Sequence, residues 1–109
     1  MAPGDLLAFP LPDGRFGGAQ ILEVTPHAVA VRVLGVLFEC APAGALDFQD
    51  APVLLDHIAV TPAHIGPPVG HMPLPPDALV GGYALWVAAG RRTVIDAPLA
   101  VLVGVLVGG

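Results

Sequence analysis

Residues 5–24 read DLLAFPLPDGRFGGAQILEV, two apolar runs on either side of a short turn. The turn, PDGR at residues 12–15, contains an Asp-Gly pair that is typical of a β-hairpin, because glycine adopts the positive φ that such a turn requires. We therefore expect one strand over Asp5–Leu11 and a return strand over Phe16–Val24. The pair Gly17-Gly18 predicts a bulge or a tight bend, where a neighbouring group leaves no space for a Cβ atom.

Short apolar segments rich in Val follow the hairpin, and Pro and Gly separate them, which favours strands over long helices. In His27–Cys40, Val29, Val31 and Val33 share one face, and Gly35 then breaks the alternation, so two strands or one bent strand fit. Ala41–Asp50 predicts a loop or a short helical turn. Four later segments are expected to be strands: Pro52–Val60, Gly82–Ala89, Thr93–Ile95 and Leu99–Val107.

The segment Thr61–Asp77 contains six prolines and predicts an irregular, locally stiff surface loop. Loops of this length without regular structure are often functional. A series of short strands with one hairpin signal indicates an all-β fold, a small antiparallel barrel or roll, with an SH3-like barrel as one form of it. The length of 109 residues predicts a single domain over residues 1–109.

The charge balance argues against a nucleic-acid partner. Nine acidic residues against four arginines give a formal charge of −5, whereas a phosphate backbone is bound by clustered Lys and Arg. An acidic surface suits a basic protein partner, although modest negative charge also serves solubility alone.

One cysteine forms no internal disulfide, and the N-terminus lacks the pattern of a signal peptide, so we expect a cytoplasmic protein.

The mean hydropathy of +0.79 raises the question of a membrane span. The longest uncharged apolar runs, Ala78–Gly90 and Ala97–Gly109, have thirteen residues each, short of the roughly 18 to 20 that a spanning helix needs. We therefore expect no membrane span. A deep β core, an oligomer interface, or both would explain the hydropathy.

The residue types that are absent exclude several kinds of chemistry. The chain has no Ser, no Asn and no Lys, which excludes a serine hydrolase, a Walker-type phosphate lysine and a Schiff base.

The histidines at intervals of seven, His57, His64 and His71, form a candidate metal site. The intervening prolines exclude a continuous helix, so we expect no metal and no cofactor. Cys40 is a candidate nucleophile, but no base adjoins it in the sequence, and a small buried apolar role is the simpler expectation.

The acidic residues and the late aromatic residues supply the candidates for partner binding. We expect Asp47, Asp50, Asp56 and Trp86 to contribute to it. On a strand, Tyr83 and Trp86 would point to opposite faces, which would leave one of them exposed for a protein partner.

Two pairs of carboxylates, Asp47 with Asp50 and Glu23 with Glu39, are available for acid–base catalysis, but nothing in the sequence shows a desolvated carboxyl. Arg91-Arg92 predicts a hairpin turn with exposed charges.

The opening segment resembles a known family. Residues 4–22, GDLLAFPLPDGRFGGAQIL, are similar to the start of a family of bacterial immunity proteins that accompany polymorphic toxins. The shared features are Gly-Asp, an apolar strand ending in Pro-Leu, Asp-Gly-Arg, an aromatic residue, small residues, and Gln before an apolar pair. The resemblance covers about a fifth of the chain, and a late Trp such as Trp86 is in keeping with it. It implies an all-β protein that binds and neutralises a toxin without catalysis.

Three hypotheses of function follow from these patterns. The first is a non-enzymatic protein-binding module, an immunity-type inhibitor of a toxin. The second is a small metal- or thiol-dependent enzyme that uses His57, His64 and His71 or Cys40. The third is a structural homo-oligomer that associates through the apolar C-terminal strands.

Overall fold

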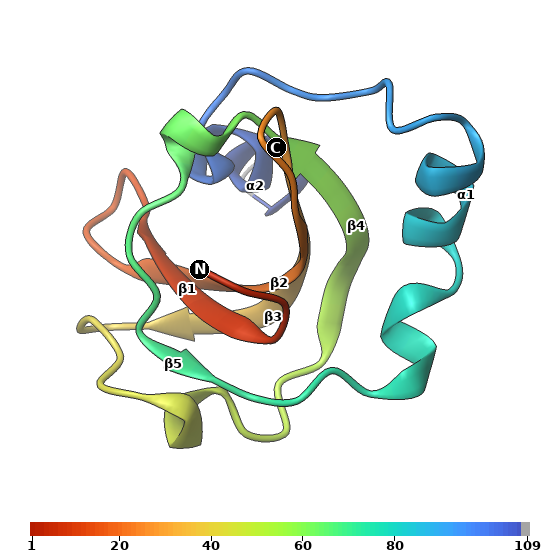
Figure 1. Cartoon of the computed structure of the whole chain (residues 1–109). Helices are drawn as coiled ribbons and strands as arrows, with labels where there is room; N and C mark the ends of the chain where they lie inside the picture. The colour runs from red at the N-terminus through yellow and green to blue at the C-terminus, as the bar shows by residue number, and fades with distance from the viewer. Residues whose placement is uncertain (108–109) are drawn as a thin grey trace.

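A computed structural model describes the backbone of residues 1–107 and the side chains of residues 1–103 (Figure 1). Its main element is a five-stranded antiparallel sheet in the order β4-β3-β2-β1-β5. The strands are β1 (Asp5–Pro10), β2 (Phe16–Val24), β3 (Val29–Phe38), β4 (Val53–Val60) and β5 (Gly70–His71). Three short 3-10 helices, η1 (Ala45–Phe48), η2 (Pro62–His64) and η3 (Pro76–Leu79), and two α-helices, α1 (Gly82–Ala88) and α2 (Leu99–Val107), complete the described part.

The predicted hairpin is confirmed. Strands β1 and β2 pair from Leu6 opposite Gln20 to Pro10 opposite Phe16, and Gly14 adopts a φ of +89° in the turn between them. The amide of Leu11 donates to the carbonyl of Arg15 at 2.8 Å, which closes the turn. The Asp-Gly pair therefore sets the register of the first two strands.

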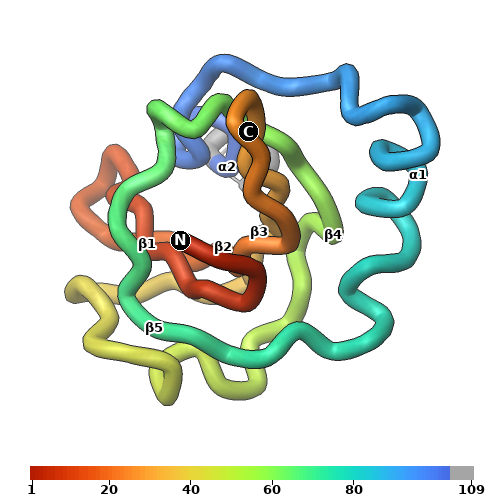
Figure 2. The backbone as a smooth tube through the Cα atoms, in the orientation of Figure 1, coloured from red at the N-terminus to blue at the C-terminus, as the bar shows by residue number. Residues whose placement is uncertain are grey.

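The irregularity expected at Gly17-Gly18 is present as a register shift between β2 and β3: Gly17 faces Leu37 and Gly18 faces Leu34, so the extra residues lie on β3. A Cβ atom on Gly17 would lie 2.5 Å from the ring of Phe9, its partner across the sheet, and one on Gly18 would lie 2.8 Å from the ring of Phe48. The two glycines thus admit an aromatic ring on each side of β2. Bulges bend the strands that contain them, and Figures 1 and 2 show a sheet that curls strongly.

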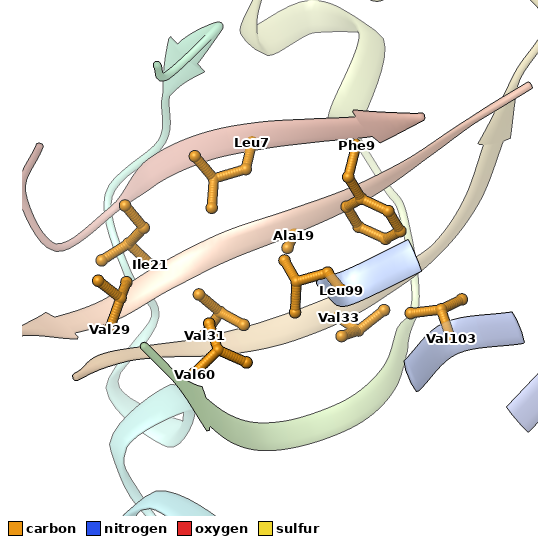
Figure 3. Packing of buried hydrophobic residues seen from close by; sticks show 10 residues of the cluster. All are labelled: Leu7, Phe9, Ala19, Ile21, Val29, Val31, Val33, Val60, Leu99 and Val103. Carbon is orange, nitrogen blue, oxygen red and sulfur yellow. The ribbon is translucent and has the colours of Figure 1, made fainter. Parts of the chain in front are cut away.

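Apolar side chains are buried on both faces of this sheet. One cluster gathers alternate residues of the first three strands with Val60 and with Leu99 and Val103 of α2 (Figure 3). The opposite face carries two further clusters, one around Trp86 and one around Phe48, so that Leu6 and Leu7 contribute to different cores. Two covered faces account for the continuous apolar runs and the high mean hydropathy. No helix within the described residues is long and apolar enough to cross a membrane.

The segment Thr61–Asp77 is mostly irregular, as expected, but it has a defined course. It leaves the β4 edge of the sheet and reaches the opposite edge, where β5 pairs with β1 (Figure 2). The amide of Val69 donates to the carbonyl of Leu6 at 2.8 Å, and the amide of Met72 donates to the carbonyl of Gly4 at 3.0 Å. The loop therefore covers the free edge of β1.

The expectations for the last third of the chain are wrong. Gly82–Ala89 and Leu99–Val107 were expected to be strands, but α1 and α2 occupy them, and Thr93–Ile95 contributes only a parallel bridge between Ile95 and Val60. Within residues 1–107 the five strands form no closed barrel, and no C-terminal strand exists to form an oligomer interface. In α1, the residues Ala, Leu and Trp are compatible with a helix. The sequence of α2 contains four Val residues, which favour a strand, but Leu99 and Val103 lie one helical turn apart and both pack into the core, which stabilises the helix.

Candidate functional site

Asp56 is the expected partner-binding residue whose cleft also contains other charged side chains, Arg32 and Asp77. It is exposed on β4, and its Oδ2 accepts a hydrogen bond from the amide of Gly82 at 2.9 Å, at the first residue of α1. A Cβ atom on Gly81 or on Gly82 would lie 2.8 Å from the carboxylate oxygens, so the two glycines allow the backbone to approach it. Asp56 therefore fixes the start of α1 against the sheet while remaining open to solvent.

The cleft beside Asp56 has a volume of about 310 Å³ and is formed by β3, β4, η3 and the residues that precede α1. Its charged residues are Arg32, Asp56 and Asp77, and its apolar residues include Val53 and Val80. Val53 is 44% exposed and Val80 is 60% exposed, and the adjacent Leu79 is exposed too. The cleft therefore combines charge with apolar side chains that the described chain leaves about half exposed.

Arg32 enters the cleft from the middle of β3 and is held by Gln20 on the neighbouring strand. Its Nε and Nη2 donate to Oε1 of Gln20 at 2.9 Å and 2.7 Å. Gln20 is fully buried, and its Nε2 donates to the carbonyls of Met72 and Gly4 at 2.8 Å and 3.3 Å. This pair was not among the expected site residues, although one sequence signal points to it: Arg32 is a charged residue inside the apolar run of residues 29–34.

Asp47 and Asp50 lie away from this cleft. Oδ2 of Asp47 accepts the backbone amides of Ala43 and Gly44 at 2.8 Å and 3.2 Å, so this carboxylate caps η1. Asp50 is exposed after η1 and adopts a φ of 63°, a left-handed conformation that Asp tolerates better than most residues. Their positions do not join them to Asp56 in a single acidic site.

Trp86 is buried, contrary to the expectation that it or Tyr83 would be free for a partner. Only 6% of it is exposed, and its Nε1 donates to the carbonyl of Thr93 at 2.8 Å. Because α1 is a helix, Tyr83 and Trp86 lie on the same face, and their ring centroids are 6.3 Å apart. Trp86 therefore contributes to the core that α1 forms with β4.

A polar cluster that the sequence did not predict lies around Glu23. Arg91 donates from Nε and Nη2 to the two carboxylate oxygens, each at 2.7 Å, and the Tyr83 hydroxyl donates to Oε1 at 2.8 Å. The Arg91 guanidinium holds the pKa of Glu23 below its usual range. Burial, and to a smaller extent the hydrogen bond to Glu23, raises the pKa of Tyr83. The hairpin expected at Arg91-Arg92 is wrong: Arg91 lies in the turn that follows α1, with a φ of 57°, and its amide donates to the carbonyl of Trp86.

His57, the first residue of the candidate metal site, packs beneath α1. Its ring lies 5.1 Å from that of Trp86, and its Nε2 is buried without a hydrogen-bond partner among the described residues. Burial lowers the pKa of His57, so the fold favours the neutral imidazole.

His64 and His71 bind carboxylates elsewhere, at 2.7 Å from Asp96 and 2.9 Å from Asp5. These histidines hold the pKa of Asp96 and the pKa of Asp5 below their usual range. The structure thus separates the three histidines, and the described residues contain no group of three side chains suited to a metal ion.

Cys40 is exposed, which corrects the expectation of a buried thiol. It lies just after the end of β3, where the chain leaves the sheet. Its place in the fold therefore makes no contribution to the apolar core.

Comparisons of the chain with protein-family models, with curated proteins and with solved structures found no match. The resemblance of residues 4–22 to immunity proteins therefore stays a prediction. Arg32, Asp56 and Asp77, together with the apolar side chains around them, form the candidate functional site.

Proposed function

We propose that this chain is a non-enzymatic protein-binding module of the immunity type, which neutralises a bacterial toxin by binding it through the cleft of Arg32, Asp56 and Asp77. The observation that carries the proposal is the surface around this cleft, where exposed Val53, Leu79 and Val80 adjoin charged side chains. Protein interfaces combine an apolar centre with polar groups around it in this way.

Charge supports the same proposal. The chain has a net charge of −5, and two of the three charged residues of the cleft are carboxylates. A basic partner would be steered towards such a surface and held there by complementary potential. The partner that fits is therefore a protein segment with basic and apolar side chains.

The hairpin of residues 5–24 adds a second line of support, since it is the segment that carries the resemblance to immunity proteins. It pairs as the Asp-Gly turn requires, and β2 supplies the buried Gln20 that holds Arg32. We also propose that the curved sheet is an all-β roll of the SH3-like kind, which the order β4-β3-β2-β1-β5 supports.

Co-expression tests the function. Each toxin domain encoded beside the gene for this chain is expressed in a bacterial host, alone and together with the chain, and growth is recorded. We expect one toxin domain to arrest growth alone and to be tolerated with the chain, and the two to co-purify as a complex. Growth arrest that the chain never relieves, with no complex, would contradict the proposal.

A further inference from the structure

Arg32 differs from the arginines that the fold pairs with acidic residues. Arg15 lies 2.6 Å from Asp13, and Arg91 lies 2.7 Å from Glu23. Within the part of the chain whose side chains are described, no carboxylate lies within 4 Å of the Arg32 guanidinium, although this residue is half-buried. A partly desolvated charge without a counter-ion is costly, and an anionic group of a ligand would lower that cost.

The guanidinium is nevertheless fixed in place by a neutral group. The buried Gln20 amide is itself oriented by the carbonyls of Met72 and Gly4, which accept from its Nε2 and so direct Oε1 towards Arg32. Two hydrogen bonds therefore hold the charged side chain directly, and two more orient the amide that accepts them. A ligand group that binds it has little further ordering entropy to overcome.

The two edges of the guanidinium are used differently. The edge formed by Nε and Nη2 is taken by Oε1 of Gln20, whereas Nη1 donates no hydrogen bond to any described residue. The edge formed by Nη1 and Nη2 therefore retains N–H donors in the geometry that binds a carboxylate through both oxygens. The cleft that Arg32 lines has a volume of about 310 Å³, in the lower part of the range for binding pockets of roughly 300–1,000 Å³.

The other charges of the cleft restrict which ligand fits. Asp56 and Asp77 share it with Arg32, so a ligand with only negative charge would be repelled. We propose that Arg32 is a carboxylate receptor for the partner protein, and that it binds an acidic side chain of a partner segment whose neighbouring basic side chains pair with Asp56 and Asp77. This inference rests on the proposed function and names the chemistry of the partner's contact segment.

Arginine side-chain NMR tests the inference without the partner. The chain has four arginines, so the Nε–Hε signal of Arg32 can be assigned by its loss in Arg32→Lys. The probe is the blocked peptide Lys-Glu-Lys, and the matched probes are Lys-Gln-Lys, Gln-Glu-Gln and sodium acetate, all at one ionic strength. We expect a saturable shift of the Arg32 signal with Lys-Glu-Lys, at least tenfold weaker binding of each matched probe, and no saturable shift of the ion-paired Arg15 signal.

Each other result overturns the inference in a defined way. Equal binding of Lys-Gln-Lys would show that the carboxylate is not recognised, and equal binding of acetate or Gln-Glu-Gln would show a simple anion site. No saturable shift up to the solubility limit of Lys-Glu-Lys would contradict the inference as a whole.

The variant Arg32→Lys keeps the charge and loses the planar fork, so we expect it to weaken Lys-Glu-Lys binding at least tenfold, as followed from backbone amide shifts at Asp56 and Asp77. Arg92→Lys, an exchange at an exposed arginine, is the matched control and should bind as the wild type does. If Arg32→Lys does not fold, the Arg32 signal is assigned by elimination from Arg15→Lys, Arg91→Lys and Arg92→Lys, and the peptide comparison on the wild-type chain still decides the matter. A toxin that binds while the peptide does not would refute this inference alone, whereas peptide binding without any toxin partner would refute the proposed function.

Discussion

Arg91 and Glu23, 68 residues apart, form a two-point ion pair in which both donor–acceptor distances are 2.7 Å. Glu23 belongs to β2, and Arg91 follows α1, so the pair connects the sheet to the helix that covers it. Tyr83 of α1 donates to the same carboxylate at 2.8 Å. Glu23 thus holds α1 at two points against the sheet.

Replacing Glu23 by Gln should loosen this connection. We expect Glu23→Gln to lower the Tm by roughly 2–5 °C at pH 7, since a partly exposed ion pair contributes modestly. Asp13→Asn, which removes a local ion pair in the exposed hairpin turn, is the matched control and should have a smaller effect. The fluorescence of Trp86, the only tryptophan, reports the unfolding of α1 directly.

The same pair predicts a pH dependence. Arg91 lowers the pKa of Glu23 in the folded state, so the stabilisation is present above the unfolded value of about 4.3 and is lost as the pH falls through the folded value. The difference in Tm between the wild type and Glu23→Gln should therefore shrink as the pH falls from 7 towards 3. A difference that stays constant would show that the carboxylate charge is not involved.

His57 should make the fold sensitive to mild acid. Because burial lowers its pKa, the unfolded chain binds a proton at a higher pH than the folded chain does. Stability should therefore fall as the pH drops below about 6.5, the ordinary value for His. Thermal unfolding at pH 7 and pH 5.5 should show this loss for the wild type and a reduced loss for His57→Phe, which keeps an aromatic ring against Trp86.

The exposed His27→Gln is the matched control for the removal of an imidazole. If His57→Phe loses as much stability between pH 7 and pH 5.5 as the wild type does, the buried imidazole is not the cause.

The Pro-rich loop should tolerate change unequally along its length. A Cβ atom on Gly70, in β5, would lie 2.8 Å from the backbone nitrogen of Ala45, whereas one on Gly66 would meet nothing within 4 Å. We expect Gly70→Ala to destabilise by about 1–3 kcal/mol and Gly66→Ala to change stability by less than about 0.5 kcal/mol, both measured by urea unfolding. Equal effects of the two substitutions would contradict the packing of β5 against η1.

The first half of the fold was predictable because its signals are local. The Asp-Gly turn fixes which residues of β1 and β2 face each other, and the Gly17-Gly18 pair marks the place where Phe9 and Phe48 need space. These features depend on a few neighbouring residues whose conformational preferences are strong.

The second half was not predictable in the same way, because distant contacts decide it. The first turn of α1 depends on Asp56, 26 residues earlier, and α2 is helical although its Val-rich sequence favours a strand. An apolar run without alternation is compatible with a buried strand or a buried helix, and packing against the sheet selects between them.

The residues of the candidate site also differ in whether local sequence could predict them. Asp56 was found from its charge, but Arg32 and Gln20 face each other only through the register of β2 and β3. A strand over Gly82–Ala89 would have left Tyr83 or Trp86 exposed, whereas on α1 Trp86 points into the core with Tyr83 beside it.

If the chain neutralises a toxin through the cleft of Arg32, Asp56 and Asp77, a substitution inside this cleft must weaken the affinity for that toxin. Val80→Arg places a long cation in the cleft, where it pairs with the carboxylates and blocks the partner, and Leu46→Arg places the same side chain at an 83% exposed position on η1. In calorimetric titrations with the toxin domain, we predict binding at least tenfold weaker for Val80→Arg, about 1.4 kcal/mol, and unchanged binding for Leu46→Arg. Wild-type affinity in Val80→Arg, with the variant folded, would contradict the claim.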